Sequence, residues 1–108
     1  MEETREKTTT FNEIINGETP VLVDFYADWC GPCKMMNPIL KSLKKKMGDR
    51  INIIKVDAEK NPDAAIKYQV RGVPTLILFK NGRILWQQAG VVQMPRLESI
   101  INEKLERQ

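Results

Sequence analysis

The sequence predicts an α/β fold, with a mixed central sheet of four to five strands and helices on both of its faces. Short apolar runs alternate with segments of helical periodicity, a pattern typical of strands joined by crossover helices. The dipeptide Asn81-Gly82 between the last two apolar runs is a strong hairpin signal. A chain of 108 residues forms one domain around a single core. We expect residues 10–108 to form this domain and residues 1–9 to be a flexible N-terminal segment.

The N-terminal half contains the predicted strand–helix–strand unit. The β-branched and aromatic run 21–27 predicts a buried strand, and the run 51–56 predicts the next one. Between them, an apolar stripe from about Cys33 to Met47, closed by Gly48, predicts a long amphipathic helix. Because parallel strands need such a crossover, the two strands should be parallel neighbours with a right-handed connection.

Shorter elements complete the predicted domain. In chain order they are a short helix capped by Thr10 and ended by Gly17, a helix from Asn61-Pro62 to about Tyr68, strands 75–80 and 83–89, and a final helix opened by Pro95. The two strands flank the hairpin signal, so they should be antiparallel.

The only two cysteines, Cys30 and Cys33, stand three positions apart, and the chain has no histidine. A structural zinc site wants four Cys or His ligands, so we expect no bound metal. A disulfide across so short a loop contributes only about 2 kcal/mol by the chain-entropy relation, which makes a structural staple a poor explanation. The spacing does place the second thiol where it resolves a mixed disulfide formed by the first. It therefore predicts redox chemistry.

The two thiols lie where the predicted strand turns into the predicted helix. Pro32 has a fixed φ suited to the first helical turn, where its missing N–H costs nothing. Cys30 then faces the free N–H groups of that turn, which favour a thiolate. The helix dipole contributes only ~0.3–1 kcal/mol, so hydrogen bonds to the sulfur must supply the rest. We assign Cys30, at an exposed corner, as the nucleophile and Cys33, one turn deeper, as the resolving thiol.

The segment Val23–Lys34, centred on Cys-Gly-Pro-Cys, resembles the active-site segment of the thioredoxin family. The resemblance covers roughly residues 10–105 and includes Pro38, Lys55-Val56-Asp57, Val73-Pro74-Thr75, Phe79-Lys80-Asn81-Gly82 and Gly90. It implies the thioredoxin fold and a protein disulfide reductase that works through a mixed disulfide. It also implies disulfide-containing protein substrates, and reducing equivalents from NADPH through a flavin-dependent thioredoxin reductase, with no cofactor bound to this chain.

The resemblance also bears on the edge of the sheet. Thioredoxins usually carry one more strand before the first helix, whereas this sequence offers only the polar segment 4–10 there. We expect that strand to be short, distorted or missing.

Asp24 stands in the middle of the first apolar run. A buried carboxyl group without good partners has a raised pKa. At a sheet edge or in a solvated pocket, the pKa of the same group would stay at its ordinary value. The resemblance implies that Asp24 accepts and donates the proton of the Cys33 thiol, through water. It also implies that Lys55 lies near Asp24 and modulates it, although a lysine by itself is more often a surface residue.

A substrate-binding rim is expected around the cysteines. X-Pro bonds are cis in only ~5–6% of cases, but the resemblance implies a cis Val73–Pro74 bond that packs against the disulfide. The Val73 backbone would then pair with an extended substrate peptide. Trp29 is compatible with a core position, but beside a redox pair we expect it at the rim. The other expected rim residues are Gly31, Pro32, Gly72, Gly90, Val91 and Val92.

Composition bears on partners and location. The net charge is only +3, and the lysines within 41–46 are expected on the solvated face of a helix, so we expect no nucleic-acid partner. No run approaches the ~18 apolar residues of a membrane span, and the first ten residues contain no apolar signal segment. We expect a cytoplasmic monomer without a membrane partner, although a mature exported or organellar form would look the same.

Two other functions are compatible with the sequence. One is the reverse reaction, catalysed by an oxidase or isomerase of exported proteins; Gly31-Pro32 resembles reductases, whereas a histidine there would suggest an oxidant. The other is a docking module that uses the apolar rim, with the thiols incidental. Replacing both cysteines by serine distinguishes redox chemistry from docking, because a docking module keeps its function without the thiols.

Overall fold

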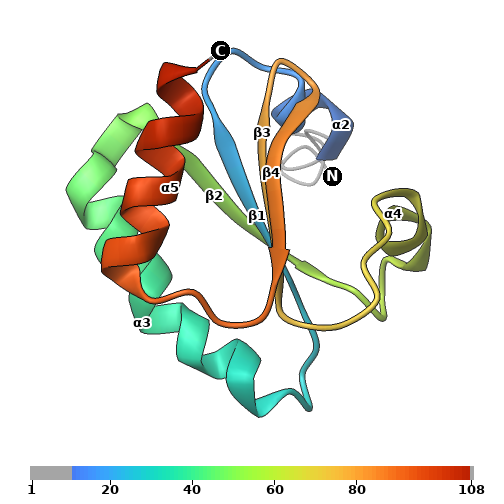
Figure 1. The fold of residues 1–108 in the computed structure, drawn as a ribbon. Helices are drawn as coiled ribbons and strands as arrows, with labels where there is room; N and C mark the ends of the chain where they lie inside the picture. The colour runs from blue at the N-terminus through green and yellow to red at the C-terminus, as the bar shows by residue number, and fades with distance from the viewer. Residues whose placement is uncertain (1–10, 108) are drawn as a thin grey trace, which may run out of the picture.

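The computed structural model describes residues 11–107. The predicted flexible segment 1–9, the cap residue Thr10 and the segment 4–10 lie outside the described residues. In chain order the elements are α2 (Phe11–Ile15), β1 (Val21–Tyr26), α3 (Gly31–Met47), the 3-10 turn η1 (Gly48–Arg50), β2 (Asn52–Asp57), α4 (Pro62–Lys67), β3 (Thr75–Lys80), β4 (Arg83–Ala89) and α5 (Met94–Glu106) (Figure 1).

The described strands form one mixed sheet in the order β2-β1-β3-β4. β1 is parallel to β2 and antiparallel to β3, and β3 is antiparallel to β4. Asp24 on β1 is therefore flanked by Lys55 on β2 and Leu76 on β3. The predicted parallel pair and the predicted C-terminal hairpin are both present, and β1 lies inside the sheet.

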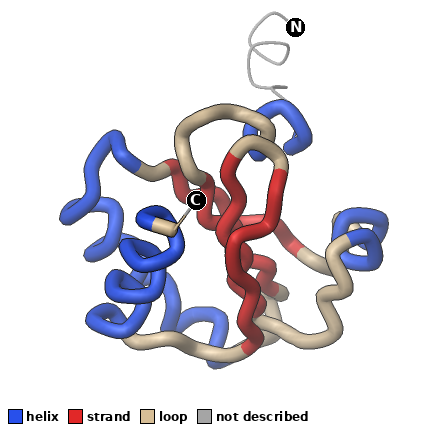
Figure 2. Tube along the Cα trace, turned by 45° about the horizontal axis from the view of Figure 1, so that its top comes forward, coloured by secondary structure: helices blue, strands red, loops and turns tan. Residues whose placement is uncertain are grey.

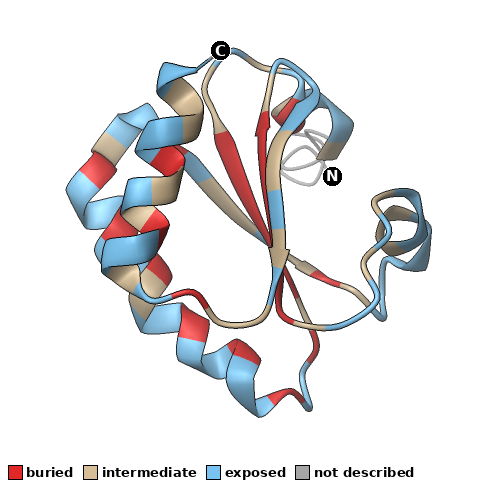
Figure 3. Cartoon of the chain, in the orientation of Figure 1, coloured by how far each residue is buried: buried red, intermediate tan, exposed pale blue. Residues whose placement is uncertain are grey.

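Helices cover both faces of the sheet. α3 and α5 lie on one side of it and α4 on the other (Figures 1 and 2). Alternate residues of β1 serve the two faces: Leu22 packs in the core under α3 and α5, whereas Val23 and Phe25 pack in the core under α2 and α4. Figure 3 shows the buried residues concentrated on the inner strands and on the inward sides of the helices. The predicted α/β architecture is confirmed.

Helix α3 begins at Gly31, two residues before the predicted start near Cys33. Cys30 is the N-cap and Pro32 lies in the first turn, so a sulfur takes the capping place that an oxygen usually fills. The apolar stripe is buried, as expected, and it contains Met36, Leu40, Leu43 and Met47. The helix ends at Gly48, whose φ of 60° suits a residue without a Cβ.

The β3–β4 hairpin closes at Asn81 and Gly82, which have φ values of 53° and 78°. Two positive φ values in a two-residue loop are the conformation that matches strand twist. The turn is also tied to the start of the chain, since the N–H groups of Asn81 and Gly82 donate to the carbonyls of Gly17 and Ile15 at 3.1 and 2.8 Å. Within residues 11–107, no helix is both long and apolar enough to cross a bilayer.

Candidate active site

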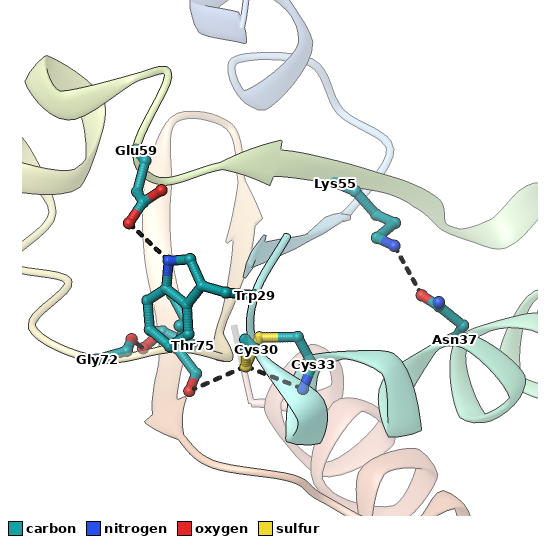
Figure 4. Close-up of a disulfide and its surroundings, with 9 residues drawn as sticks. Trp29, Cys30, Cys33, Asn37, Lys55, Glu59, Gly72 and Thr75 are labelled. Atoms are coloured by element: carbon teal, nitrogen blue, oxygen red, sulfur yellow. Dashed lines mark hydrogen bonds between the residues drawn. A yellow bond between two sulfur atoms is a disulfide. The ribbon is translucent and has the colours of Figure 1, made fainter. Parts of the chain in front are cut away.

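Cys30 and Cys33 form a disulfide at the N-terminal end of α3 (Figure 4). The backbone N–H of Cys33 donates to Cys30 Sγ at 3.1 Å. This is the N–H···S interaction that the motif predicts. The Cys30 sulfur thus has a donor in place that favours its thiolate form.

The expectation that Cys30 stands at an exposed corner is wrong for the disulfide form. Both cysteines are only 3% exposed. The reason is tertiary: Ala27, Tyr26 and Val73 pack against the pair, and the Val73 carbonyl oxygen lies 3.7 Å from Cys30 Sγ. A disulfide sulfur carries no proton, so this contact becomes a hydrogen bond only when Cys30 is a thiol. The two sulfurs differ in their polar neighbours rather than in their exposure.

Asp24 is completely buried, and neither carboxylate oxygen has a hydrogen-bond partner among the described residues. Burial raises the pKa of Asp24 from 3.8 to about 6, and the positive charge of Lys55 lowers it in part. An edge position is excluded, because β1 has a neighbour on each side. Asp24 is therefore a carboxyl group that changes protonation state close to neutral pH.

Lys55 is the register neighbour of Asp24, but its ammonium group contacts other residues. Nζ donates to Asn37 Oδ1 at 2.7 Å (Figure 4). It also lies 4.7 Å from the centre of the Tyr26 ring. Sequence reasoning missed Asn37, although its position one helical turn after Cys33 places the two residues on one side of α3.

Trp29 lies at the rim, with 69% of its surface exposed. Its indole Nε1–H donates to Glu59 Oε2 at 2.7 Å, so a carboxylate from the loop after β2 holds the ring (Figure 4). A pocket of about 230 Å³ beside the ring is lined by Ala27, Trp29, Ala58, Glu59, Ala65, Val70, Arg71, Gly72 and Val73. Sequence reasoning did not find Glu59, because nothing local links it to a residue 30 positions away.

The Val73–Pro74 peptide bond is cis, and Pro74 is buried. Hydrogen bonds bring two rim glycines to this segment: Thr75 Oγ1 donates to the Gly72 carbonyl at 2.6 Å, and the Gly90 N–H donates to the Pro74 carbonyl at 2.8 Å. The remaining predicted rim residues differ in exposure: Gly31, Pro32 and Gly72 are exposed, and Val73, Gly90 and Val91 are half-buried.

Val92 does not belong to the rim. It is buried in the core between the sheet and the helices α3 and α5. Its neighbour Val91 keeps partial exposure. Across residues 11–107, no group of three or more acidic or thiol side chains is placed to hold a metal ion.

The family model for thioredoxin matches residues 3–103. The chain belongs to the thioredoxin family. It is 39% identical to thioredoxin C-2 of Corynebacterium nephridii over 93 residues, which are 86% of each chain. It is 44% identical to thioredoxin 1 of Chlorobaculum tepidum, over 77% of this chain and 83% of that one.

The fold agrees with a solved thioredoxin structure. A mutant thioredoxin from Halobacterium salinarum superposes with a TM-score of 0.80 and 35% identity, over 90% of this chain and 84% of that one. The predicted family, thioredoxin fold and activity are thereby confirmed: the chain is a thiol–disulfide oxidoreductase of the protein disulfide reductase type. Its redox centre is the Cys30–Cys33 pair.

Proposed function

We propose that this thioredoxin reduces protein disulfides with Cys30 as nucleophile, Cys33 as resolving thiol and Asp24 as the proton carrier. One observation carries the order of attack. Cys30 Sγ is the atom that accepts the Cys33 N–H at the start of α3. A thiolate at that position is stabilised by the hydrogen bond and by the helix N-terminus.

The reaction proceeds by two exchanges. The Cys30 thiolate attacks one sulfur of the substrate disulfide, forms a mixed disulfide and releases the other substrate sulfur as a thiolate. The Cys33 thiolate then attacks Cys30 Sγ, and the second substrate sulfur leaves. Both substrate thiolates take up protons, and the Cys30–Cys33 disulfide holds the oxidised state.

Asp24 supplies proton transfer for the second exchange. Its carboxylate takes the Cys33 proton through water, and the acid form then returns a proton to the departing substrate thiolate. A pKa of about 6 suits both steps, because the group is neither a strong acid nor permanently protonated at neutral pH.

The substrate peptide lies along the Val73 segment. Val73 is next to Cys30, and its backbone offers hydrogen-bonding groups to an extended chain. Trp29, Gly31, Pro32, Gly72, Gly90 and Val91 supply the surrounding contact surface. Small and apolar residues accept many side chains, which suits a reductase with varied protein substrates.

Each turnover leaves the protein as a disulfide, so two electrons and two protons must come from another reductant. We propose a flavin-dependent thioredoxin reductase that uses NADPH as this partner. We also propose that the chain acts as a monomer in the cytoplasm, where a reducing thiol pool keeps dithiols available. A related thioredoxin Y of rice is described as chloroplastic, and this chain covers only 59% of its length.

The redox potential and the coupled assay test these proposals together. We expect the Cys30–Cys33 potential to lie near the ~−270 mV typical of thioredoxins, rather than near the ~−120 mV of a strong dithiol oxidant. With NADPH and a thioredoxin reductase, the protein should reduce a disulfide-bonded substrate protein at many turnovers per molecule. A potential close to that of the oxidants, with faster oxidation of reduced substrates than reduction of disulfides, would assign the reverse reaction. If a Cys30→Ser, Cys33→Ser double variant keeps the biological function of the protein, the protein is a docking module whose thiols are incidental.

A further inference from the structure

The ammonium group of Lys55 is held by two side chains from two other elements. Asn37 on α3 accepts its hydrogen bond at 2.7 Å, and the Tyr26 ring on β1 lies under it at 4.7 Å (Figure 4 shows the Asn37 contact). Lys55 itself comes from β2. An exposed lysine on an outer strand of the described sheet therefore has a defined place against the active-site helix.

That place adjoins Asp24. Lys55 and Asp24 are direct neighbours in the parallel pair of β2 and β1, so their side chains leave the same face of the sheet. Tyr26 lies two residues further along β1 and shares this face, and it packs against the cluster of Cys30 and Cys33. Asn37 follows Cys33 by one helical turn. The held ammonium thus contacts the helix of the resolving cysteine, and its lysine leaves the sheet on the same face as Asp24.

No hydrogen bond joins Lys55 to Asp24, whose oxygens have no described partner. The influence of the lysine on the carboxyl group is therefore electrostatic and acts across a gap. Such an influence depends on where the charge stays on average. The residues that hold the Lys55 ammonium in place therefore also determine how strongly its charge stabilises the Asp24 carboxylate.

We propose that Asn37 and the Tyr26 ring are positioning residues that hold the Lys55 ammonium beside Asp24 and thereby set the pH range of proton transfer to and from Cys33. The link to proton transfer rests on the proposed role of Asp24. The positioning itself is a property of the folded chain and can be measured separately.

The other charged groups of the described chain near this site lie on α3 and β2. On α3, Lys44 donates to the carbonyls of Gly48 and Ile51, and the exposed Lys41 lines a pocket together with Asn37 and Lys55. On β2, Asp57 accepts the N–H groups of Glu59 and Lys60. β3 presents the apolar Leu76 beside Asp24. Within residues 11–107, Lys55 is the cation whose charge acts on Asp24.

Removing Asn37 should let the ammonium move into solvent. A lysine side chain has many rotamers and a strongly hydrated head group, and one cation–π contact at an exposed site is weak. In water the charge is screened and its average distance from Asp24 increases. The stabilisation of the Asp24 carboxylate by Lys55 then decreases, so the pKa of Asp24 should rise.

The test is an NMR titration of the Asp24 carboxyl carbon in the reduced protein and its variants. Asn37→Ala should raise the pKa of Asp24 toward its value in Lys55→Met. In the double variant, Asn37→Ala should add nothing to Lys55→Met, because the positioned charge is already absent. Ser42→Ala, an exposed neutral residue of the same helix, should leave the titration unchanged. Tyr26→Phe keeps the ring and should also change nothing, whereas Tyr26→Leu should raise the pKa of Asp24 by less than Asn37→Ala, because the Asn37 hydrogen bond remains.

Three results would overturn the positioning. The first is an unchanged pKa of Asp24 in Asn37→Ala. The second is a lower pKa, which would mean that Asn37 holds the ammonium away from Asp24. The third is an equal rise in the presence and absence of Lys55, which would mean that Asn37 acts through the fold.

The role of Asp24 fails in a different experiment. If positioning and proton transfer are linked, the pH midpoint of mixed-disulfide resolution should move upward in Asn37→Ala by as much as the Asp24 titration does. If the rate of mixed-disulfide resolution is unchanged in both Asn37→Ala and Asp24→Asn, Asp24 is not the proton carrier. The titration result for the positioning of Lys55 would still stand.

Discussion

At the scale of single residues, the buried carboxyl group of Asp24 lowers the stability of the fold when it is charged. Its carboxyl group is fully buried without a described partner, between Lys55 and Leu76 in the sheet. Asp57 is also buried, but it accepts two backbone N–H groups at 2.9 and 3.2 Å. A buried acceptor with partners contributes to stability, whereas one without them costs stability when it is charged.

Asp24→Asn should therefore stabilise the protein at high pH. The pKa of Asp24 is raised to about 6 in the folded state, so ionisation of the group is less favourable there than in the unfolded chain. The cost is absent below pH ~4, grows between pH ~4 and ~6, and is complete above that range. A difference of about two pKa units corresponds to about 3 kcal/mol, and the buried amide retains part of that cost, so we expect a gain of about 1–3 kcal/mol at pH 8.

Urea unfolding at pH 4 and pH 8 checks this expectation. The gain should be much smaller at pH 4, and Asp57→Ala should serve as the opposite control by destabilising the protein at pH 8. A loss of stability in Asp24→Asn at pH 8 would contradict the costly-charge account. The same variant should slow resolution of mixed disulfides near pH 7 and affect the attack by Cys30 less.

The two cysteines should be separable by trapping. Cys33→Ser leaves the nucleophile but removes the resolving thiol, so mixed disulfides with substrate proteins should accumulate. Cys30→Ser removes the sulfur that accepts the α3 N–H and should trap little or nothing. Non-reducing gels followed by mass spectrometry identify the linked cysteine. Trapping through Cys33 alone would reverse the assignment of nucleophile and resolving thiol.

At the scale of elements, the β3–β4 hairpin depends on its turn and on α2. Gly82 has a φ of 78°, and a Cβ there would collide with the Asn16 side chain. The N–H groups of the turn are already committed to the carbonyls of Ile15 and Gly17. The turn therefore joins two segments that are far apart in the sequence, and it does so away from the redox centre.

Gly82→Ala should destabilise the protein by about 1–2 kcal/mol, from the left-handed strain alone. Gly17→Ala is the matched control on the facing segment, since Gly17 lies outside the left-handed region and its nearest contact would be an ordinary 3.5 Å from the Ile14 carbonyl. It should change stability by less than about 1 kcal/mol. Thermal unfolding measures both, and disulfide reduction at room temperature should be unchanged in both. Equal losses in the two variants would argue against the turn conformation as the cause.

At the scale of the whole molecule, one sheet separates two cores. Leu43 of α3 belongs to the core shared with α5, and Phe25 of β1 belongs to the core under α2 and α4. Because β1 contributes alternate residues to both cores, a substitution that destabilises one core should also destabilise the other. A domain of this size should unfold as one cooperative unit.

Leu43→Ala should cost about 2–5 kcal/mol, because Leu43 is fully buried in a packed core. Met35→Ala lies on the same helix but removes a side chain that is 54% exposed, and it should cost less than about 0.5 kcal/mol. Circular dichroism and tryptophan fluorescence should report the same unfolding midpoint in each variant. Separate midpoints in Leu43→Ala would show that the two cores unfold independently.

Local patterns in the sequence determined much of this protein. Apolar periodicity located β1, β2 and α3 to within two residues, and Asn81-Gly82 located the hairpin, because each depends on neighbours a few positions apart. The Cys-Gly-Pro-Cys segment identified the redox centre for the same reason, since its chemistry requires only a short spacing at a helix start.

Only the tertiary structure decided what surrounds those cysteines. Val73 packs against Cys30 and contributes to its burial. Glu59 holds the Trp29 ring through a hydrogen bond, and Asn37 holds the Lys55 ammonium in the same way. Each pair is separated by 18 to 43 residues and carries no mutual signal in the sequence. Packing of the loops and helices around β1 brings these side chains together, and that packing sets exposure, hydrogen bonding and the pKa of Asp24.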